Sequence, residues 1–359
     1  MQKPTIIIPC AGKSSRYPNL RPKFLLINPN GNLMFQDAIS KLNLRNCNIV
    51  VTVLKEHEQE YGLKGMFKKF FPKFQLCVLD KPTKSQSETV CVTLKQMQIG
   101  GPFLIKDSDN IFKMHQIKED FNYVAVENLE NIGAVNPCNK SYVLYDSSGI
   151  ITNIEEKKII SDTFSVGGYY FTEPQKFIKI FNKLSKSNLD GEIYVSKIIN
   201  YLIFNNQAKF KIKNVSEYLD LGTINEWMDY KDKIKTYFID IDGVIVENGG
   251  EYWKPYWGTT QGLPENIKLI QKLYEQGNQI VLFTARKAKY REITIKQLKK
   301  NNIKYNHLIM GLFHSQRILI NDFTDSNPYP SAVAVNIPRN LDELNKYLKT
   351  GPVDFEKKT

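Results

Sequence analysis

Residues that organise small metal or disulfide sites are scarce in this sequence. The chain has 359 residues but five cysteines and four histidines. The cysteines are odd in number, widely spaced and without a CxxC pair, which argues against a disulfide framework and favours a reducing, cytoplasmic location. The histidines are equally dispersed, which argues against a zinc site. These residues are Cys10, Cys47, Cys77, Cys91 and Cys138, and His57, His115, His307 and His314.

Long apolar runs are absent as well. No segment approaches the roughly 18 apolar residues of a membrane span. Met1–Pro4 leads directly into the apolar run Thr5–Pro9, which leaves no room for a signal peptide. The sequence has no zinc-finger or RNP motif, no internal repeat and no low-complexity tract. We therefore expect no membrane and no nucleic acid as partner, and we leave a homo-oligomer open.

Acidic residues are outnumbered by basic ones. The formal net charge is +12, from 49 Lys and Arg against 37 Asp and Glu. Such an excess attracts anions, including nucleotides, sugar phosphates and nucleic acids. Because the lysines are dispersed rather than gathered into tracts, solvated surfaces explain most of them.

The first part of the chain alternates between strand-like and helix-like segments, which predicts a parallel α/β sheet. A more strand-rich stretch follows, with a hairpin turn at 145–149. Expected strands are Thr5–Pro9, Asn48–Leu54, Phe74–Asp80, Phe103–Lys106, 132–135, 141–145, 150–154 and 166–171. Expected helices are 56–69, 88–97, 173–184 and 192–205.

A polar, charged segment at 226–235 precedes a second alternating pattern. There we expect strands at 237–240, 279–284 and 317–321 and helices at 265–276 and 290–301. A length of 359 residues suits two domains. We therefore predict an α/β protein with two domains. The first, residues 1–233, is Rossmann-like with a mixed sheet, and the second, residues 234–359, is a smaller Rossmannoid domain.

The loop after the first expected strand has the sequence PCAGKSSR at 9–16, and RPK follows at 21–23. Small residues let backbone N–H groups approach phosphate oxygens closely. Arg16 can then neutralise the β- and γ-phosphates of a nucleotide, and Lys23 can reach the α-phosphate or an acceptor phosphate. By itself the pattern fits a structural strand–loop–helix turn about equally well.

Two aspartates strengthen the functional interpretation. Asp109 follows an expected strand, and Asp220 lies in the sequence LDLGT at 219–223. Carboxylates from separate strand ends can hold one Mg²⁺ between a nucleotide α-phosphate and an attacking phosphate. Taken singly, each aspartate would more often be a turn or cap residue. Asp107 is an alternative to Asp109 as the metal ligand.

With these motifs, residues 4–227 resemble the sugar-phosphate nucleotidyltransferases with a GT-A-like fold. The matching pieces also include EK at 156–157, VGGYYF at 166–171 and DLGT at 220–223. The resemblance implies that Arg16 and Lys23 are catalytic and that Asp109 and Asp220 bind Mg²⁺. It implies acceptor binding by Glu156, Lys157 and Gly168, and nucleotide binding by Ala11, Gly12, Ser14, Ser15, Gln86, Ser87 and Asp107.

The chain departs from this family at two glycine positions. Ser14 stands where a glycine usually precedes Ser15, and Ser85 replaces the glycine of the base-binding loop. Short polar side chains at 85–87 suit a pyrimidine edge and leave less room for a purine. Since the relatives it most resembles are cytidylyltransferases of capsule pathways, CTP is the favoured nucleotide, with UTP, dTTP and GTP as alternatives.

The second half carries a different constellation of phosphate chemistry. Asp240 and Asp242 end an expected strand, Thr284 ends the next, and Arg317 and Asp322 follow further on. Asp240 is suited to attack phosphorus and form an aspartyl phosphate, and Asp242 to protonate the leaving group and activate water. Thr284 can hydrogen-bond the phosphoryl group, Arg317 supplies a cation, and Asp322 joins both aspartates as an Mg²⁺ ligand.

Residues 236–345 resemble the haloacid-dehalogenase phosphatase superfamily. The matching motifs are DIDGV at 240–244, TAR at 284–286 and IND at 320–322. The resemblance implies a phosphatase without a large cap domain. The lysine usual in the third motif has no clean equivalent, so Arg317 is preferred over Lys299 and Lys304. An inactive domain kept for dimerisation or regulation is the alternative.

These features predict a bifunctional enzyme that uses Mg²⁺. One domain would transfer a nucleotidyl group to a phosphorylated sugar or polyol, giving a CDP-linked precursor of capsule or surface polysaccharide. The other would remove phosphate from a related metabolite. The alternatives are a nucleotidyltransferase with an inactive second domain, a nucleotide-sugar binding or scaffold protein, and a nucleic-acid end-processing enzyme.

Overall fold

The structure is a computed structural model that describes residues 2–12, 16–17, 20–131, 139–187, 191–321 and 332–349. The chain forms two compact units, Met1–Tyr230 and Lys231–Thr359. The boundary between them falls within helix α7 (Ile224–Lys233), close to the division expected from the sequence between residues 233 and 234. The strand expected at 132–135 lies outside the described residues.

The segment 226–235, expected as a polar connection, is mostly the helix α7. Thr223 and Glu226 form a capping box, in which the backbone N–H of Thr223 donates to Oε2 of Glu226 at 2.8 Å and that of Glu226 to Oγ1 of Thr223 at 3.3 Å. Trp227 is buried, and its Nε1 donates to Oδ1 of Asn28 at 3.0 Å. The helix therefore begins with a cap readable in the sequence, and Trp227 packs in a cluster of the first unit that Ile224, Met228 and Tyr230 also contact.

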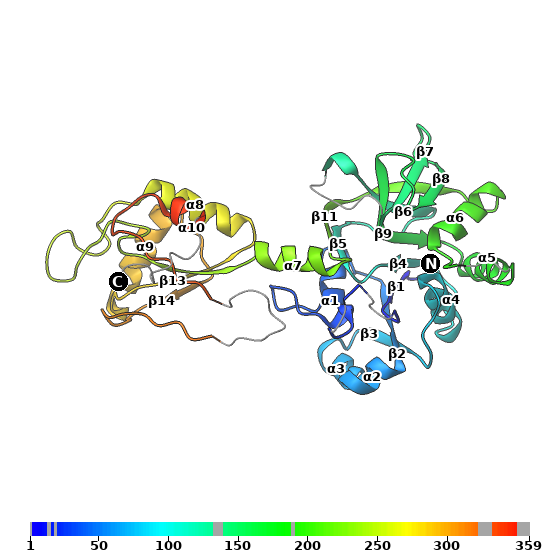
Figure 1. The fold of residues 1–359 in the computed structure, drawn as a ribbon, viewed down its shortest axis with the longest axis horizontal. Helices are drawn as coiled ribbons and strands as arrows, with labels where there is room; N and C mark the ends of the chain where they lie inside the picture. The colour runs from blue at the N-terminus through cyan, green and yellow to red at the C-terminus, as the bar shows by residue number, and fades with distance from the viewer. Residues whose placement is uncertain are drawn as a thin grey trace, which may run out of the picture. The chain divides into compact units, whose positions relative to one another are not determined.

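A nine-stranded sheet forms the centre of the first unit, and it is mixed as expected, although the number of its strands was not predicted (Figure 1). Along its main path, β1 pairs in parallel with β2 and β4, whereas β9 runs antiparallel to β4 and β6. A hairpin of β7 (Ser141–Tyr145) and β8 (Ile151–Glu156) joins the sheet through β9. The path is β10 (Phe210–Asn214), β6 (Asn122–Asn128), β9 (Thr163–Phe171), β4 (Phe103–Lys106), β1 (Thr5–Pro9), β2 (Asn48–Leu54) and β3 (Phe74–Leu79).

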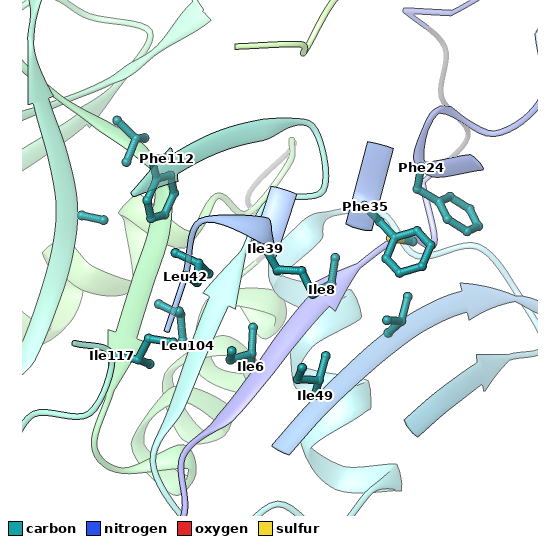
Figure 2. Packing of buried hydrophobic residues seen from close by; sticks show 14 of the residues in the cluster. Ile6, Ile8, Phe24, Phe35, Ile39, Leu42, Ile49, Leu104, Phe112 and Ile117 are labelled. Atoms are coloured by element: carbon teal, nitrogen blue, oxygen red, sulfur yellow. The ribbon is translucent and has the colours of Figure 1, made fainter. Parts of the chain in front are cut away.

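Helices cover both faces of this sheet. Successive side chains of β1 point to opposite faces, so β1 packs against the helices on each side. Ile6 and Ile8 pack with Phe35 and Ile39 of α1 (Met34–Ser40) on one face (Figure 2). Ile7 points to the other face, where α4 (Gln86–Gln96), α5 (Pro174–Lys186) and α6 (Val195–Phe204) gather (Figure 1). A strand buried on both faces reads as a continuous apolar run, which is why β1 was predictable.

One expected helix is two helices in the structure. The segment 56–69 forms α2 (Lys55–Tyr61) and α3 (Leu63–Phe70), separated at Gly62. Gly62 has φ +60°, the left-handed conformation in which glycine ends helices without steric penalty. The charge and apolar spacing gave the correct helical content but not the break.

The strand order places a crevice beside β1. The chain runs from β1 to β2 and β3 on one side and then crosses to β4 on the other side of β1. In open α/β sheets, ligands bind outside the carboxyl ends of strands at such a reversal. The loops that follow β1 and β4 both start at this point, so the sheet topology brings their side chains together.

A two-stranded antiparallel ribbon stands beside the main sheet. It consists of β5 (Asn110–Lys113) and β11 (Ser216–Asp220), two strands that the sequence did not reveal. Asp220 pairs with Asn110, and Leu219 pairs with Ile111. This register places the end of β11 next to the residues that immediately precede β5.

The second unit has a parallel sheet in the order β12 (Thr236–Asp240), β13 (Gln279–Phe283) and β14 (His307–Ile309). Helices α8 (Pro264–Glu275) and α9 (Arg291–Lys300) pack Ile270 and Leu298 against the strands, and α10 (Leu344–Lys349) follows later in the chain. The strand expected at 317–321 is wrong: these residues form no strand, and Ile318 is 79% exposed. Apolar, β-branched composition specifies a strand only where a partner strand pairs with it.

Within the residues that the structure describes, no helix has both the length and the apolar content needed to cross a membrane.

The packing of the sheet predicts opposite effects for two glycine substitutions in the first unit. A Cβ on Gly168 would lie 2.8 Å from Cβ of Ala125 and 3.0 Å from the ring of Phe112. Gly168→Ala should therefore lower the free energy of unfolding by about 1–3 kcal/mol through overpacking. Gly65→Ala, in α3 with nothing within 4 Å, should raise it by about 0.5–1 kcal/mol. Urea unfolding followed by circular dichroism tests both, and equal effects would contradict the packing described for β9.

Candidate active sites

A polar cavity of about 600 Å³ opens at the carboxyl ends of β1 and β4 in the first unit. Its wall combines the loop after β1, the residues after β4, the start of α4, the end of β8 and the end of β11. Segments from the whole length of the unit therefore meet at one place. The residues that line it include Cys10, Gly12, Arg16, Lys23, Gln86, Asp107, Asp109, Lys140, Glu156, Lys157 and Asp220.

The β5–β11 ribbon brings the two predicted metal-binding aspartates together. The backbone N–H of Leu221 donates to the carbonyl of Asp109 at 2.8 Å, and Asp220 pairs with Asn110, so Asp109 and Asp220 lie diagonally across the ribbon. A Cβ built on Gly222 would lie 3.1 Å from Oδ1 of Asp220, 3.6 Å from Oδ2 of Asp109 and 3.7 Å from Nη1 of Arg16. Two carboxylates and one guanidinium thus converge on a single point in the cavity.

A lysine neutralises each of these carboxylates. Lys23, at the start of the short 3₁₀ helix Lys23–Leu25, pairs with Asp109, and Lys140 pairs with Asp220. Burial alone would raise the pKa of Asp109, but Lys23, Arg16 and Lys106 outweigh it and lower that pKa to about 2. The sequence predicted Arg16 and Lys23 at this site, whereas Lys140 carried no motif that could have revealed it.

Asp107 differs from Asp109 in its surroundings. Its carboxylate accepts a hydrogen bond from Gln86, and burial together with the charge of Asp109 raises its pKa to about 6. A side chain on Gly167, which has φ +75°, would lie 2.2 Å from Oδ2 of Asp107, so only glycine fits there. Asp107 therefore faces Gln86 and Gly167, while Asp109 faces Asp220, which favours Asp109 over Asp107 as the metal ligand.

Lys106 is a fully buried cation beneath the acidic residues, and the sequence analysis missed it. Its Nζ donates to the carbonyls of Asp107 and Asn110, both at 2.8 Å, and lies 4.6 Å from the ring centre of Phe112. Burial lowers the pKa of Lys106 to about 8, although Asp107 and Asp109 oppose the shift. An ammonium in this position fixes the turn between β4 and β5 and offsets the negative charge above it.

The predicted nucleotide-binding residues separate into two groups. Gly12 and Gln86 line the cavity, together with Asp107. Ala11 and Ser87 are buried outside its wall, and Oγ of Ser87 donates to the carbonyl of Ile193. Ser14 and Ser15 lie outside the described residues. Ser85 caps α4, because its Oγ accepts a hydrogen bond from the N–H of Glu88 at 3.1 Å.

Two of the three predicted acceptor residues, Glu156 and Lys157, lie at the open end of the β7–β8 hairpin. Glu156 lines the cavity opposite its pairing partner Ser141. Lys157 donates to the hydroxyl of Tyr194 at 3.0 Å and has φ +58°, a conformation that non-glycine residues adopt mainly where surrounding structure imposes it. Gly168 does not line the cavity, because its missing side chain faces Ala125; its neighbour Gly167 lines the wall instead.

Tyr17 ties the loop after β1 to the segment after β11. Its hydroxyl hydrogen-bonds the carbonyls of Leu221 and, at 2.9 Å, Thr223, and its ring packs edge-on against Trp227 at 6.4 Å between centroids. The tyrosine is buried although it follows an exposed arginine, Arg16, in the sequence. This contact holds Arg16 beside the aspartates, and no sequence motif indicated it.

In the second unit, the residues predicted for phosphate chemistry meet at the carboxyl ends of β12 and β13. Oγ1 of Thr284 donates to Oδ2 of Asp242 at 3.1 Å, and Nη2 of Arg317 lies 3.7 Å from Oδ1 of Asp240. Burial raises the pKa of Asp240; Arg317 opposes that shift and the charge of Asp242 adds to it. Asp322 lies outside the described residues.

Arg286 dominates the surroundings of Asp242, and the sequence analysis gave it no role. Its guanidinium is fully buried and donates to both carboxylate oxygens, from Nε at 2.9 Å and from Nη2 at 2.7 Å. Its Nη1 donates to Gln297 at 2.9 Å and to Thr294 at 3.2 Å. The TAR sequence at 284–286, which places this arginine two residues after Thr284, was the available signal.

The fit of a divalent cation can be tested on the donors themselves. No group of three or more His, Cys, Asp or Glu side chains occurs among the described residues in an arrangement that could hold a metal. Mg²⁺ typically takes one or two carboxylates and completes its shell with water and substrate phosphates. Asp109 and Asp220, converging in an open polar cavity, fit that requirement.

Comparison with known proteins gives a fold relationship. The sequence matches no protein-family profile and no curated protein. Among solved structures, a nucleoside-diphosphate-sugar pyrophosphorylase from Vibrio cholerae RC9 aligns with a TM-score of 0.52 and 19% identity, over 63% of this chain and 99% of that one. The CTP:phosphocholine cytidylyltransferase of Streptococcus pneumoniae aligns with a TM-score of 0.51 and 15% identity, over 64% and 98%. The likeness shows a shared fold over a share of the chain close to that of the first unit.

The environment of Cys10 predicts an unreactive thiol in the cavity wall. Burial raises the pKa of Cys10 to about 12, even though Lys23 lies nearby. Since the thiolate is the nucleophile, alkylation should be very slow at pH 8 and should accelerate as the pH rises. Peptide mapping after iodoacetamide treatment of the native protein tests this, with the partly exposed Cys47 as reference. Rapid labelling of Cys10 at pH 7 would contradict the described burial.

Proposed function

We propose that the first unit transfers a nucleotidyl group from a nucleoside triphosphate to a phosphorylated sugar or polyol, with release of pyrophosphate. The observation that carries the proposal is the convergence of Asp109, Asp220 and Arg16 in a cavity that Lys23 also lines. The fold shared with a nucleoside-diphosphate-sugar pyrophosphorylase and a cytidylyltransferase supports it. The substrates are small molecules, and we propose a cytoplasmic location for the enzyme.

In the proposed reaction, an oxygen of the acceptor phosphate forms a bond to the α-phosphorus of the nucleotide. The bond from that phosphorus to the oxygen bridging the β-phosphate breaks, and pyrophosphate leaves with the electron pair. Arg16 and Lys23 stabilise the charge that develops on the phosphates. Mg²⁺, held by Asp109 and Asp220, would supply further charge stabilisation when bound. Glu156 and Lys157 orient the acceptor.

CTP is the nucleotide that we propose. Gln86 and the N-terminal turn of α4 border the cavity, and Ser85 occupies the place of a glycine there. Side chains in this loop leave less space for a purine than glycine would, and short polar groups suit a pyrimidine edge. The product would be a CDP-linked sugar or polyol, a precursor of capsule or other surface polysaccharide.

The proposed reaction predicts Mg²⁺-dependent pyrophosphate release with CTP as the best substrate. The measurement is kcat/KM for CTP, UTP, dTTP, ATP and GTP against a panel of hexose, heptose and polyol phosphates. A purine nucleotide better by about tenfold, or roughly 1.4 kcal/mol, would overturn the base assignment but not the reaction. If no pair releases pyrophosphate, the reaction itself is wrong.

For the second unit we propose hydrolysis of a phosphomonoester through an aspartyl phosphate on Asp240. Asp240 and Asp242 at the end of a parallel strand, with Thr284 and Arg317 close by, support this chemistry. The alternative is an inactive domain that serves as a scaffold or dimerisation module. The occupation of both oxygens of Asp242 by Arg286 favours that alternative, because a fully paired carboxylate is a poor proton donor.

Two activities on separate cores predict that they can be separated by mutation. Asp240→Asn should abolish phosphate release from a phosphomonoester and leave pyrophosphate release intact. Asp109→Ala should have the reverse effect, since each unit packs around its own hydrophobic cluster. Both activities are measured on the full chain with purified variants. A single substitution that silences both would replace this picture with a shared site or obligate coupling.

A further inference from the structure

We propose that Lys140 is a phosphate-binding residue of the nucleotidyl-transfer site. It shares Asp220 with the divalent cation, and it binds the acceptor phosphate when the cation takes that carboxylate. This inference rests on the proposed nucleotidyl transfer and adds a residue that no sequence motif indicated. Its basis is the position of Lys140 between the acceptor residues and the metal-binding carboxylates.

The backbone of Lys140 belongs to the acceptor side of the cavity. Lys140 directly precedes β7, and its carbonyl accepts a hydrogen bond from the N–H of Lys157 at 2.8 Å. The next residue, Ser141, pairs with Glu156 across the hairpin. Lys140 and Lys157 are therefore backbone neighbours at the open end of β7 and β8, and both line the cavity.

The side chain of Lys140 reaches the metal-binding side. Its ammonium pairs with Asp220 and donates to the hydroxyl of Tyr218 at 2.8 Å, both on β11. It lies 5.3 Å from the ring centre of Tyr218 and 5.7 Å from that of Phe164. Lys140 is 8% exposed, so its ammonium is held beside Asp220, Tyr218 and Phe164 rather than in solvent.

The charges around Asp220 explain why Lys140 would bind phosphate once a metal is present. An ammonium and a divalent cation that bind one carboxylate repel each other, so occupation of Asp220 by metal weakens its pair with Lys140. Lys140 is nearly buried, and a buried ammonium needs a new negative partner. The phosphate of the acceptor supplies one, because the flexible stem of lysine carries a point charge that suits phosphate oxygens. Lys140 would thus favour acceptor binding after the cation is in place.

The first test measures metal binding without turnover. Mn²⁺ alone is titrated into the full chain and the free ion is followed by electron paramagnetic resonance. Lys140→Met, which removes the competing charge, should tighten Mn²⁺ binding by at least about threefold, a change that even more exposed ion pairs can produce. Lys140→Arg should stay near the wild type.

The matched control is Lys41→Met, since Lys41 pairs with the exposed Glu217, which keeps Lys113 as a second partner. Equal Mn²⁺ affinity for wild type and Lys140→Met would overturn the proposed competition.

The second test measures phosphate binding. With the substrate pair selected by the screen above, Lys140→Met should raise the KM for the acceptor by about tenfold, the scale of a lost charge-assisted hydrogen bond. The KM for the nucleotide should stay within about threefold, and Lys140→Arg should recover part of the loss. An unchanged acceptor KM, or an equal rise for the nucleotide, would overturn the acceptor assignment. If Lys140→Met unfolds by circular dichroism, Lys140→Gln takes its place.

The two proposals fail in distinguishable ways. If the wild type releases no pyrophosphate with any pair, the proposed reaction is wrong, whereas the Mn²⁺ titration still decides whether Lys140 competes for Asp220. Binding of inorganic phosphate at saturating Mn²⁺, measured by calorimetry, then replaces the kinetic test. Weaker phosphate binding by Lys140→Met supports the assignment of Lys140, and unchanged binding overturns it.

Discussion

The first unit is organised around two carboxylates that approach each other in a cavity. Asp109 immediately precedes β5 and Asp220 ends β11, so the β5–β11 ribbon sets their separation. Like charges held close together are unfavourable unless cations neutralise them. Lys23 and Lys140 pair with them directly, and Arg16 lies at the point where they converge. The cavity walls are thus fixed by charge balance as well as by packing, since each cation comes from a different loop.

Much of the fold was predictable because buried parallel strands are continuous apolar runs. β1, β2 and β4 have the predicted limits, and Ile6, Ile7 and Ile8 show why: each is fully buried. The short antiparallel strands β5 and β11 escaped prediction because they mix polar and apolar residues without long alternation. At 317–321 the error was the opposite one, because a strand was predicted where none forms. An apolar run is buried as a strand only if a partner strand pairs with it, and the sequence does not reveal that partner. In α7, by contrast, the capping box of Thr223 could have predicted the start of a helix. The charged composition of the segment led instead to the prediction of a polar connection.

Site residues could be predicted where their side chains suit phosphate or metal chemistry and lie in a short motif. Residues that only hold another site residue in position could not be predicted. Arg16, Lys23, Asp109 and Asp220 lie in short motifs, and the structure brings them to one cavity. Lys106 and Tyr17 could not have been found, because a buried lysine and a buried tyrosine look like surface residues in a sequence. Their roles depend on contacts between segments distant in the chain, with the carbonyls of Asn110 and Leu221 respectively. Gly168 is the opposite case, because it was predicted as a site residue. Its lack of a side chain allows close packing against Ala125, and the neighbouring Gly167 lies at the site instead.

The cations that hold the aspartates differ between the two units, and the difference bears on what each aspartate can do. Lys23 and Lys140 are single point charges on flexible stems, which suits the exchange with a metal and a phosphate that we propose for Asp109 and Asp220. Arg286 instead donates two hydrogen bonds to the carboxylate of Asp242 and is fully buried. Removing Asp242 from that pair would leave a buried guanidinium unpaired, which typically costs about 3–5 kcal/mol. Both oxygens of Asp242 are thus occupied, which counts against the acid/base role predicted for it from the sequence. Asp240 is less constrained, because its partner Arg317 is 3.7 Å away and partly exposed.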